Sequence, residues 1–438
     1  MMKKSLLVLV ALICIGSVKA QVWTLDKCVS YAMENNLNIK LSKLNVDMAE
    51  INKLDSRFSM YPNLNASASQ SNSFGRAINP FTNTYVSQNV SSVNLNASTN
   101  VTVFNGFSKI NAFRGDKESL EAEKLTLEKS RNDIALFVIN AYMNVLYTQD
   151  LVRVAKEQLD VTKSQLDRSE KNAAVGNATQ GDVLNIKSQV ATDELNVTTA
   201  QNNLDIAKLD LIQLLDRDPG EGFEVVRPEN VDQYLTANTF SNLKDVYSTA
   251  ESTLPDVKIL EYKYNAAKFN LAAAKGNLYP RLNLGAGLGS DYADVNPSSF
   301  NNQINNNFSK FVSFQLSVPI FNGFSARNNV KRASIALTSA DINRQQSKLT
   351  LSKNIQQAIA DLRGAKMKYE STQRSNQSLK EAFKYSQQRF DVGLLNSVDY
   401  GLSKNNVAKS DADLIQAKYE LILRAKLLDF YNGKPLTF

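Results

Sequence analysis

The stretch VNLNASTNVTVFNGF, residues 93–107, holds the two signals that decide the fold. From Val93 to Val103, every second side chain is apolar or a threonine, and the residues between them are Asn, Ser and Thr. This period of two predicts a β-strand with one apolar and one polar face. The next four residues, Phe104–Phe107, open a long segment with helical periodicity. The stretch therefore marks a junction between a strand and a helix.

The same junction occurs a second time in the chain. Phe104-Asn105-Gly106-Phe107 recurs 217 residues later as Phe321-Asn322-Gly323-Phe324, and Tyr61-Pro62 recurs 218 residues later as Tyr279-Pro280. Such self-similarity predicts a tandem duplication. We expect a first repeat over residues 21–216, built as a helix, two strands, a long helix and a returning helix. A polar connection over 217–240 then leads to a second repeat over 241–438.

The segment after Phe107 has a heptad pattern. Val138, Val145 and Val152 lie seven residues apart, which is coiled-coil spacing. A helix from near Ser108 to near Lys171 would be about 95 Å long. On their own, these helices are as compatible with a plain coiled-coil rod or spacer as with any other function.

The alternating segments favour a membrane protein over a rod. Leu64 to Ala68, Val93 to Val103, Leu282 to Leu288 and Val312 to Ile320 all alternate, and the polar faces carry mostly Asn, Ser, Thr and Gln. This pattern fits a transmembrane β-barrel, although a soluble sandwich shows a similar alternation. The joining segments 70–91 and 290–307 are polar and typical of extracellular loops. Four strands cannot close a barrel, so we expect an oligomer; dimers, trimers and larger rings all satisfy this requirement.

The N-terminus and the overall composition narrow the function classes. Residues 1–20 have Lys3 and Lys4 before a short apolar run, which predicts a secretory signal cleaved after Ala20. Cys28 is the only cysteine after that point, and its helical spacing to Leu25 and Ala32 predicts a buried, unreactive side chain. The chain has 438 residues, no histidine and a net charge of +7. We therefore expect no enzyme, no cofactor, no metal site and no nucleic-acid partner.

The repeated order of elements, the two Tyr-Pro pairs, the two Phe-Asn-Gly-Phe junctions and the paired Val-Gly turns closely resemble the TolC-type outer-membrane efflux factors. The resemblance covers essentially the whole chain after the signal segment. It implies an α+β membrane protein with four transmembrane strands per chain. Three chains would form one shared, trimeric, twelve-stranded barrel, which a long α-helical coiled-coil tunnel continues into the periplasm. It also implies a homotrimer in contact with outer-membrane lipid, a periplasmic adaptor (membrane fusion) protein, and an inner-membrane transporter as the pump.

The resemblance also assigns roles to the two helical turns. Val175, Gly176, Val392 and Gly393 would form turns on which the adaptor docks. Asp182 and Asp399 follow these turns at the periplasmic entrance, and each is either a helix-capping residue or has a sharper role. Asp399 would join a ring of carboxylates that favours cations, and Asp182 would help to hold neighbouring helices together. The family's polar latch and second acidic ring have no counterpart here, because Phe390, Leu395 and Leu402 replace a tyrosine, an arginine and an aspartate. Leu395 and Leu402 are therefore expected to form a hydrophobic constriction instead.

The expected function is thus the outer-membrane channel of a tripartite export system, a passive duct from adaptor and pump to the outside. The alternative is a periplasmic coiled-coil scaffold or adaptor without its own pore; an envelope enzyme is disfavoured by the missing histidines. The sequence does not decide whether the cargo is a drug, a metal or a protein. Export of a protein would be type I secretion.

Overall fold

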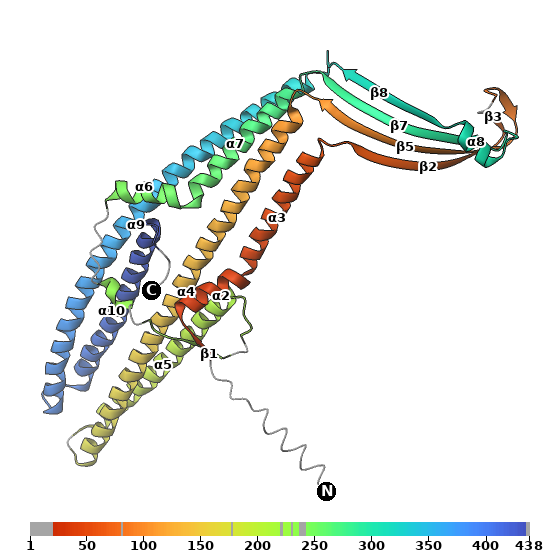
Figure 1. Cartoon of the computed structure of the whole chain (residues 1–438). Helices are drawn as coiled ribbons and strands as arrows, with labels where there is room; N and C mark the ends of the chain where they lie inside the picture. The colour runs from red at the N-terminus through yellow and green to blue at the C-terminus, as the bar shows by residue number, and fades with distance from the viewer. Residues whose placement is uncertain are drawn as a thin grey trace, which may run out of the picture. The chain divides into compact units, whose positions relative to one another are not determined.

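The computed structural model describes residues 21–79, 82–176, 178–219, 222–228, 231–235 and 242–434 (Figure 1). The predicted secretory signal, residues 1–20, lies outside this range. The chain folds into two compact units. The first contains Met1–Lys43, Leu127–Pro255 and Lys348–Phe438, and the second contains Leu44–Thr126 and Asp256–Ser347.

The helices of the two halves match in order and length. Each half has successive helices of 11, 22, 67 and 35 residues: α2 (Leu25–Asn35), α3 (Leu37–Phe58), α4 (Ser108–Ala174) and α5 (Gln180–Leu214), then α6 (Leu243–Thr253), α7 (Pro255–Gly276), α9 (Ser325–Asp391) and α10 (Ser397–Tyr431). The long helix expected to end near Lys171 continues to Ala174. The single N-terminal helix expected in each half is two helices, because the chain breaks at Asn36 and at Leu254.

The second unit contains an antiparallel sheet with the strand order β2-β5-β7-β8. These strands are β2 (Asn63–Ser73), β5 (Val90–Phe104), β7 (Arg281–Ala293) and β8 (Ser309–Ser317), so each alternating segment of the sequence forms a strand. The last strand ends at Ser317, and Val318 and Ile320, which were expected to continue it, lie beyond its end. Among the described residues, β2 and β8 each pair along one side only, so both edges of the sheet are open.

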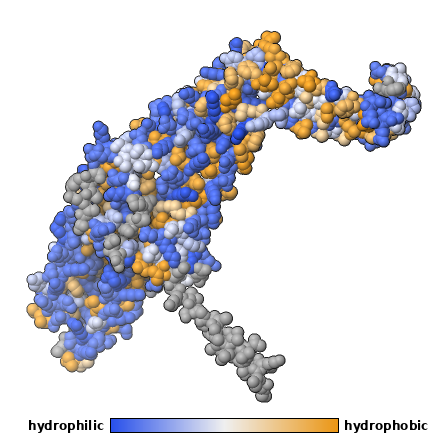
Figure 2. Space-filling model, viewed as in Figure 1, coloured by the Kyte–Doolittle hydropathy of each residue, from blue (hydrophilic) through white to orange (hydrophobic). Residues whose placement is uncertain are grey.

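The register of the sheet keeps most of the apolar residues on one face, and Phe311, which pairs with Gly287 on the other face, is an exception. Thr99 pairs with Leu64 on one side and with Ala286 on the other, and Ala286 pairs with Val312. The opposite face carries mainly Asn, Ser and Gly, including Gly285, Gly287 and Gly289 of β7. Large side chains of the apolar face, such as Leu64 and Phe314, are exposed, and Figure 2 shows hydrophobic residues gathered on the sheet. The sheet is therefore apolar on a face that the chain itself leaves uncovered.

The loops between the strands are shorter and more ordered than expected. Strand β2 continues to Ser73 and β7 to Ala293, both inside segments expected to be loops. A ribbon of β3 (Arg76–Ile78) and β4 (Tyr85–Ser87) and a short helix, α8 (Phe300–Asn306), occupy much of the remainder. Gln303 of α8 is buried and exchanges two hydrogen bonds, of 3.0 and 3.1 Å, with the backbone of Ala293.

The first unit is a helical bundle with a continuous apolar core. Its core includes Trp23, Tyr142, Leu211 and Ile422, together with the heptad residues expected from the sequence, Val138, Val145 and Val152. Burying a large apolar side chain contributes about 1.5–3 kcal/mol. Cys28 is fully buried in this core, and burial raises the pKa of its thiol to about 12, as an unreactive structural residue requires. No helix in the described part of the chain is long and apolar enough to span a membrane.

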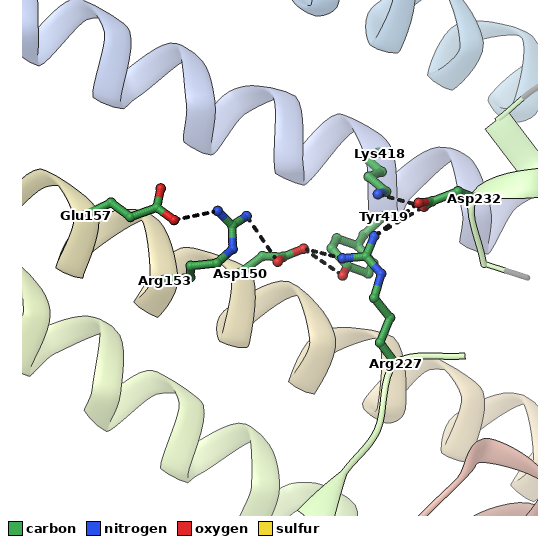
Figure 3. A network of polar contacts seen from close by, with 7 residues as sticks. All are labelled: Asp150, Arg153, Glu157, Arg227, Asp232, Lys418 and Tyr419. Carbon is green, nitrogen blue, oxygen red and sulfur yellow. Dashed lines mark hydrogen bonds and ion pairs between the residues drawn. The ribbon is translucent and has the colours of Figure 1, made fainter. Parts of the chain in front are cut away.

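The connection between the halves is anchored to the helical bundle. Its strand β6 (Phe223–Val225) pairs in parallel with β1 (Gln21–Trp23), and a 3₁₀ helix, η1 (Val231–Leu235), follows. Figure 3 shows Arg227 of the connection paired with Asp150 on α4 and with Asp232. Arg227 Nη1 lies 3.5 Å from Asp150 Oδ2, and Arg227 Nη2 lies 3.2 Å from Asp232 Oδ1. Asp232 Oδ1 also lies 2.7 Å from Nζ of Lys418 on α10. The connection therefore ties a helix of the first half to a helix of the second.

Candidate functional site

Two helical hairpins of the first unit carry the residues that the sequence singles out. Helix α4 ends at Ala174 and α5 begins at Gln180, while α9 ends at Asp391 and α10 begins at Ser397. Gly176 and Gly393 have φ angles of +79° and +74° in these turns. A Cβ atom added at either position would have no neighbouring heavy atom within 4 Å. Glycine is therefore favoured at both positions by the left-handed backbone conformation and not by crowding.

The two aspartates that follow the turns lie in the first turns of α5 and α10, and only Asp182 completes a capping box. Thr179 is the N-cap of α5 and forms a capping box with Asp182: the Asp182 N–H donates to Thr179 Oγ1 at 3.1 Å, and the Thr179 N–H donates back to Asp182 Oδ2 at 3.4 Å. At the second turn the Asp399 N–H donates to Oδ1 of Asn396 at 2.8 Å. Asp399 Oδ2 accepts a hydrogen bond from Asn396 Nδ2 at 2.8 Å, so Asn396 is the cap of α10 and Asp399 binds the side chain of that cap. The structure does not bring Asp182 and Asp399 into contact with each other.

Asp182 makes a second bond that connects the hairpins. The Ser397 hydroxyl donates to Asp182 Oδ1 at 2.8 Å, which joins the start of α5 to the start of α10. The hydrogen bonds from Thr179 and Ser397 together lower the pKa of the Asp182 carboxyl below its ordinary value of 3.8. Nη1 of Arg168, near the end of α4, lies 3.6 Å from Oδ1 of Asp391 at the end of α9. Two polar links therefore hold the two turns side by side.

The second hairpin has an aromatic cluster just inside its turn. Tyr400 is buried between Phe390 and Phe383; its ring stacks on Phe390 at 4.6 Å with an angle of 29°. Burial raises the pKa of Tyr400 above its ordinary value. The ring of Phe390 therefore holds the end of α9 against α10 by packing on Tyr400.

A buried ion pair further along the hairpins was not expected from the sequence. Lys404 Nζ on α10 lies 3.2 Å from Asp193 Oδ2 on α5, and their side chains are only 2% and 3% exposed. The ammonium group also donates to Thr162 Oγ1 and, at 3.2 Å, to the Gln158 carbonyl, both on α4. Thr162 donates to the same Asp193 oxygen, and Gln189 donates to the other at 2.9 Å. All charges are hydrogen-bonded, as a buried pair requires.

A signal for this pair was present in the heptads. Asp193 lies three residues after Val190 and four before Val197, so it occupies a core position of the returning helix. Lys404 stands three residues before Val407, in the corresponding stripe of α10. A charged residue at a core position of each of two returning helices indicates that the two meet.

The predicted docking and constriction residues lie at the ends of the hairpins. Val175, Val392 and Leu402 are exposed, as are Leu394 and Val398 beside them, while Leu395 is half-buried. Leu395 and Leu402 therefore do not form a constriction within one chain. No cluster of metal-ligating side chains occurs among the residues that the structure describes.

Comparisons with known proteins identify a family model and relatives that are similar to this chain. A family model described as outer membrane efflux protein matches residues 28–217 and 246–433. The chain is 20% identical to the outer membrane protein TolC of Vibrio cholerae over 426 residues, which cover 96% of this chain and 93% of that protein. It is 22% identical to toxin and drug export protein A of Aggregatibacter actinomycetemcomitans, but there it spans only 64% of the relative's length.

Solved structures share the fold at low sequence identity. The match to CusC has a TM-score of 0.81 at 16% identity and covers 94% of this chain and 92% of that one. The match to VceC, from Vibrio cholerae, has a TM-score of 0.79 at 15% identity and covers 94% and 96%. The helical hairpins and the four-stranded sheet thus belong to one shared architecture.

Proposed function

The chain belongs to the outer membrane efflux protein family, and from that premise we propose that it is the outer-membrane channel of a tripartite export system. Its location is the outer membrane, with the helical part extending into the periplasm. Three copies form a passive duct that receives cargo from a periplasmic adaptor and an inner-membrane pump.

The observation that carries this proposal is the four-stranded sheet with one apolar face and two open edges. Its strands are 9 to 15 residues long, sufficient for tilted strands to cross a bilayer. Unpaired edges are not tolerated in hydrocarbon, because their N–H and C=O groups find no water there. A ring of copies in which β8 of one chain pairs with β2 of the next removes both edges, and three copies yield twelve strands.

The helical hairpins would form the periplasmic end of the duct. The exposed apolar side chains Val175 and Val392, next to the turn glycines Gly176 and Gly393, offer a surface for the helices of an adaptor. Apolar groups at the tips of long polar helices would otherwise face water, which favours a partner protein there. Leu394 and Val398 extend this surface on the second hairpin.

The entrance itself would be set by the second hairpin. Three copies of Asp399 would place carboxylates around the axis, which favours cations even while each carboxylate accepts a hydrogen bond from Asn396. Three copies of Leu402, exposed in the single chain, would form a hydrophobic constriction together with Leu395. Asp182 would act differently, holding the first hairpin to the second through Ser397.

The relatives export different cargoes. Their names include a toxin and drug export protein, an alkaline protease secretion protein and a pyoverdine export protein. We therefore assign cargo selection to the pump, and the family is one of channels and not of enzymes.

Planar-bilayer conductance of the purified oligomer tests this function. Discrete openings are expected from the parent, with a cation preference that falls in Asp399→Ala when measured at two salt concentrations. The alternative, a periplasmic scaffold without a pore, predicts a folded oligomer that does not conduct, even in the double variant Leu395→Ala/Leu402→Ala. Openings with an unchanged cation preference would support the channel proposal and leave Asp399 only with its local role at the start of α10.

A further inference from the structure

The apolar face of the four-stranded sheet is hollowed around Ala97. Two depressions of about 500 and 410 Å³ adjoin there and share Ala97 and Leu288. Four alanines from three strands line them: Ala66, Ala68, Ala97 and Ala286. An alanine side chain is a single methyl group, so the face is lower here than at the larger side chains of Leu64, Leu95 and Val312. We call the two depressions together the alanine groove.

Helix α8 bounds the alanine groove at the end of β7 that is farthest from α7. Ser290 Oγ of β7 donates a hydrogen bond to the Ile304 carbonyl at 2.6 Å, and the ring centres of Tyr292 and Phe300 lie 5.1 Å apart. By alternation, Ser290 and Tyr292 belong to the apolar face of β7, so α8 lies on that side of the sheet. Phe300 and Phe308 stay exposed. Aromatic side chains gathered at one end of transmembrane strands are typical of the membrane–water interface.

A single lysine stands on this face at the same end of the sheet. Lys310 of β8 pairs with Leu288, so its side chain shares the apolar face, and it lines the alanine groove. The ammonium group is exposed and has no ion pair or hydrogen bond with any residue that the structure describes. Asp291, the acidic residue of β7, is at a position of the polar face. A cation surrounded by apolar side chains in a membrane is costly unless it reaches an anion at the interface.

The position of Lys310 in its strand directs it toward the cell exterior. It is the second residue of β8, whereas α9, which belongs to the periplasmic part, begins eight residues after that strand ends. Phe308 stands two residues before it, so the ammonium group and the aromatic side chains share one level. The outer leaflet of an outer membrane consists largely of an acylated glycolipid that carries phosphate groups. The lysine stem can cover apolar surface while its ammonium group reaches such a phosphate.

We propose that the alanine groove is a binding site for one molecule of this acylated, phosphorylated glycolipid per chain. An acyl chain lies over Ala66 and Ala97, and the Lys310 ammonium group binds a phosphate of the same molecule. The inference goes beyond the proposed channel function and rests on its membrane-spanning sheet. Charge complementarity selects the occupant, because an uncharged acyl chain would fill the groove and leave Lys310 unpaired.

The exposed side of α8 favours a sugar headgroup over the smaller headgroup of a phospholipid. Its sequence, FNNQINN, contains four exposed asparagines: Asn301, Asn302, Asn305 and Asn306. Each side-chain amide can both donate and accept hydrogen bonds, as recognition of sugar hydroxyls requires. Because α8 packs on the apolar side of β7, these amides lie beside the groove at the level of the headgroups.

Native mass spectrometry of the oligomer in mild detergent tests this site, with hexa-acylated, bisphosphorylated lipid A as the probe. Lys310→Gln removes the cation, and Ala97→Phe fills the groove without touching the cation. Arg281→Gln and Leu284→Phe are the matched controls, because they make similar changes on β7 of the same sheet but outside the groove. Lys310→Arg keeps the charge. Conductance of each oligomer is measured in parallel.

The parent is expected to retain one lipid A per chain. Lys310→Gln and Ala97→Phe should each weaken this binding about tenfold or more, since the first removes a charge-assisted hydrogen bond and the second the space for the acyl chain. Arg281→Gln, Leu284→Phe and Lys310→Arg should bind as the parent does. Lipid A without its phosphates should bind the parent as weakly as the intact probe binds Lys310→Gln.

Undiminished binding by Lys310→Gln overturns the site, even if Ala97→Phe fails to assemble. Equal binding of phosphatidylglycerol and lipid A by the parent overturns the choice of a glycolipid. A parent oligomer that conducts but holds no lipid A overturns the site and leaves the channel intact. A parent that neither conducts nor holds lipid A overturns the channel proposal as well.

Discussion

The ammonium group of Lys404 and the carboxylate of Asp193 form an ion pair at 3.2 Å in the interior of the helical bundle. Lys404 belongs to the second half of the chain, and Asp193 to the first. The pair therefore cross-links the two hairpins whose ends carry the proposed entrance. Because an unpaired charge at this buried position is costly, each residue of the pair depends on the other.

Removing one partner of this pair should destabilise the protein strongly. In Lys404→Met, Asp193 stays buried without its cation, and we expect the free energy of unfolding to fall by about 3–5 kcal/mol. The double variant Lys404→Met/Asp193→Leu should recover most of this loss. Denaturant unfolding of the solubilised oligomer measures both.

The exposed pair Lys384 and Glu381 is the matched control for that experiment, since its side chains are 65% and 57% exposed. Lys384→Met should lower the free energy of unfolding by no more than about 0.5 kcal/mol. Equal losses in Lys384→Met and Lys404→Met would show that the buried pair has no special role.

The bond between Asp182 and Ser397 should persist at all pH values above about 4. Hydrogen bonds to Thr179 and Ser397 lower the pKa of Asp182 in the folded protein. For a carboxylate with a depressed pKa, the stabilisation is fully present above the unfolded value, about 3.9, and is lost as the pH falls through the folded value. Ser397→Ala should therefore change the opening probability at pH 7 and pH 5, and differ little from the parent in stronger acid. An opening probability identical to the parent at pH 7 would contradict a role for this bond.

The turn glycines should not tolerate a side chain, whereas a glycine inside a helix should. Gly176→Ala and Gly393→Ala place a Cβ at φ angles of +79° and +74°, and each is expected to cost about 1 kcal/mol. Gly364→Ala, at an exposed position inside α9, should raise stability by about 0.5–1 kcal/mol. Thermal unfolding midpoints compare the three variants. Shifts in the same direction would refute the conformational explanation.

Leucines at the second turn should restrict flow through the closed channel. The double variant Leu395→Ala/Leu402→Ala removes apolar volume near the axis, so its basal conductance and compound leakage should increase. Val398→Ala is the control, because Val398 is as exposed as Leu402 but was not assigned to the constriction. If the double variant conducts no more than Val398→Ala, the hydrophobic constriction is wrong.

Much of the fold followed from local periodicity. Alternation from Val93 to Val103 predicted β5, the heptads after Ser108 predicted α4, and Gly176 and Gly393 marked turns that need positive φ. Capping was one of the two roles expected for Asp182, because a carboxylate near a helix start is favoured locally. These features depend on residues within a few positions of one another, and a single sequence displays them.

What the sequence by itself determined is therefore the long helices and the four strands of the main sheet, their repeated order and the predominantly apolar face of each strand. Only the tertiary structure decided which elements meet: Ser397 with Asp182, 215 residues apart, and Lys404 with Asp193, 211 residues apart. It also decided that β6 of the connection pairs with β1 at the start of the described chain. The physical reason is that side-chain periodicity specifies which face of an element is buried, whereas the partner of that face depends on the packing of segments far apart in the chain.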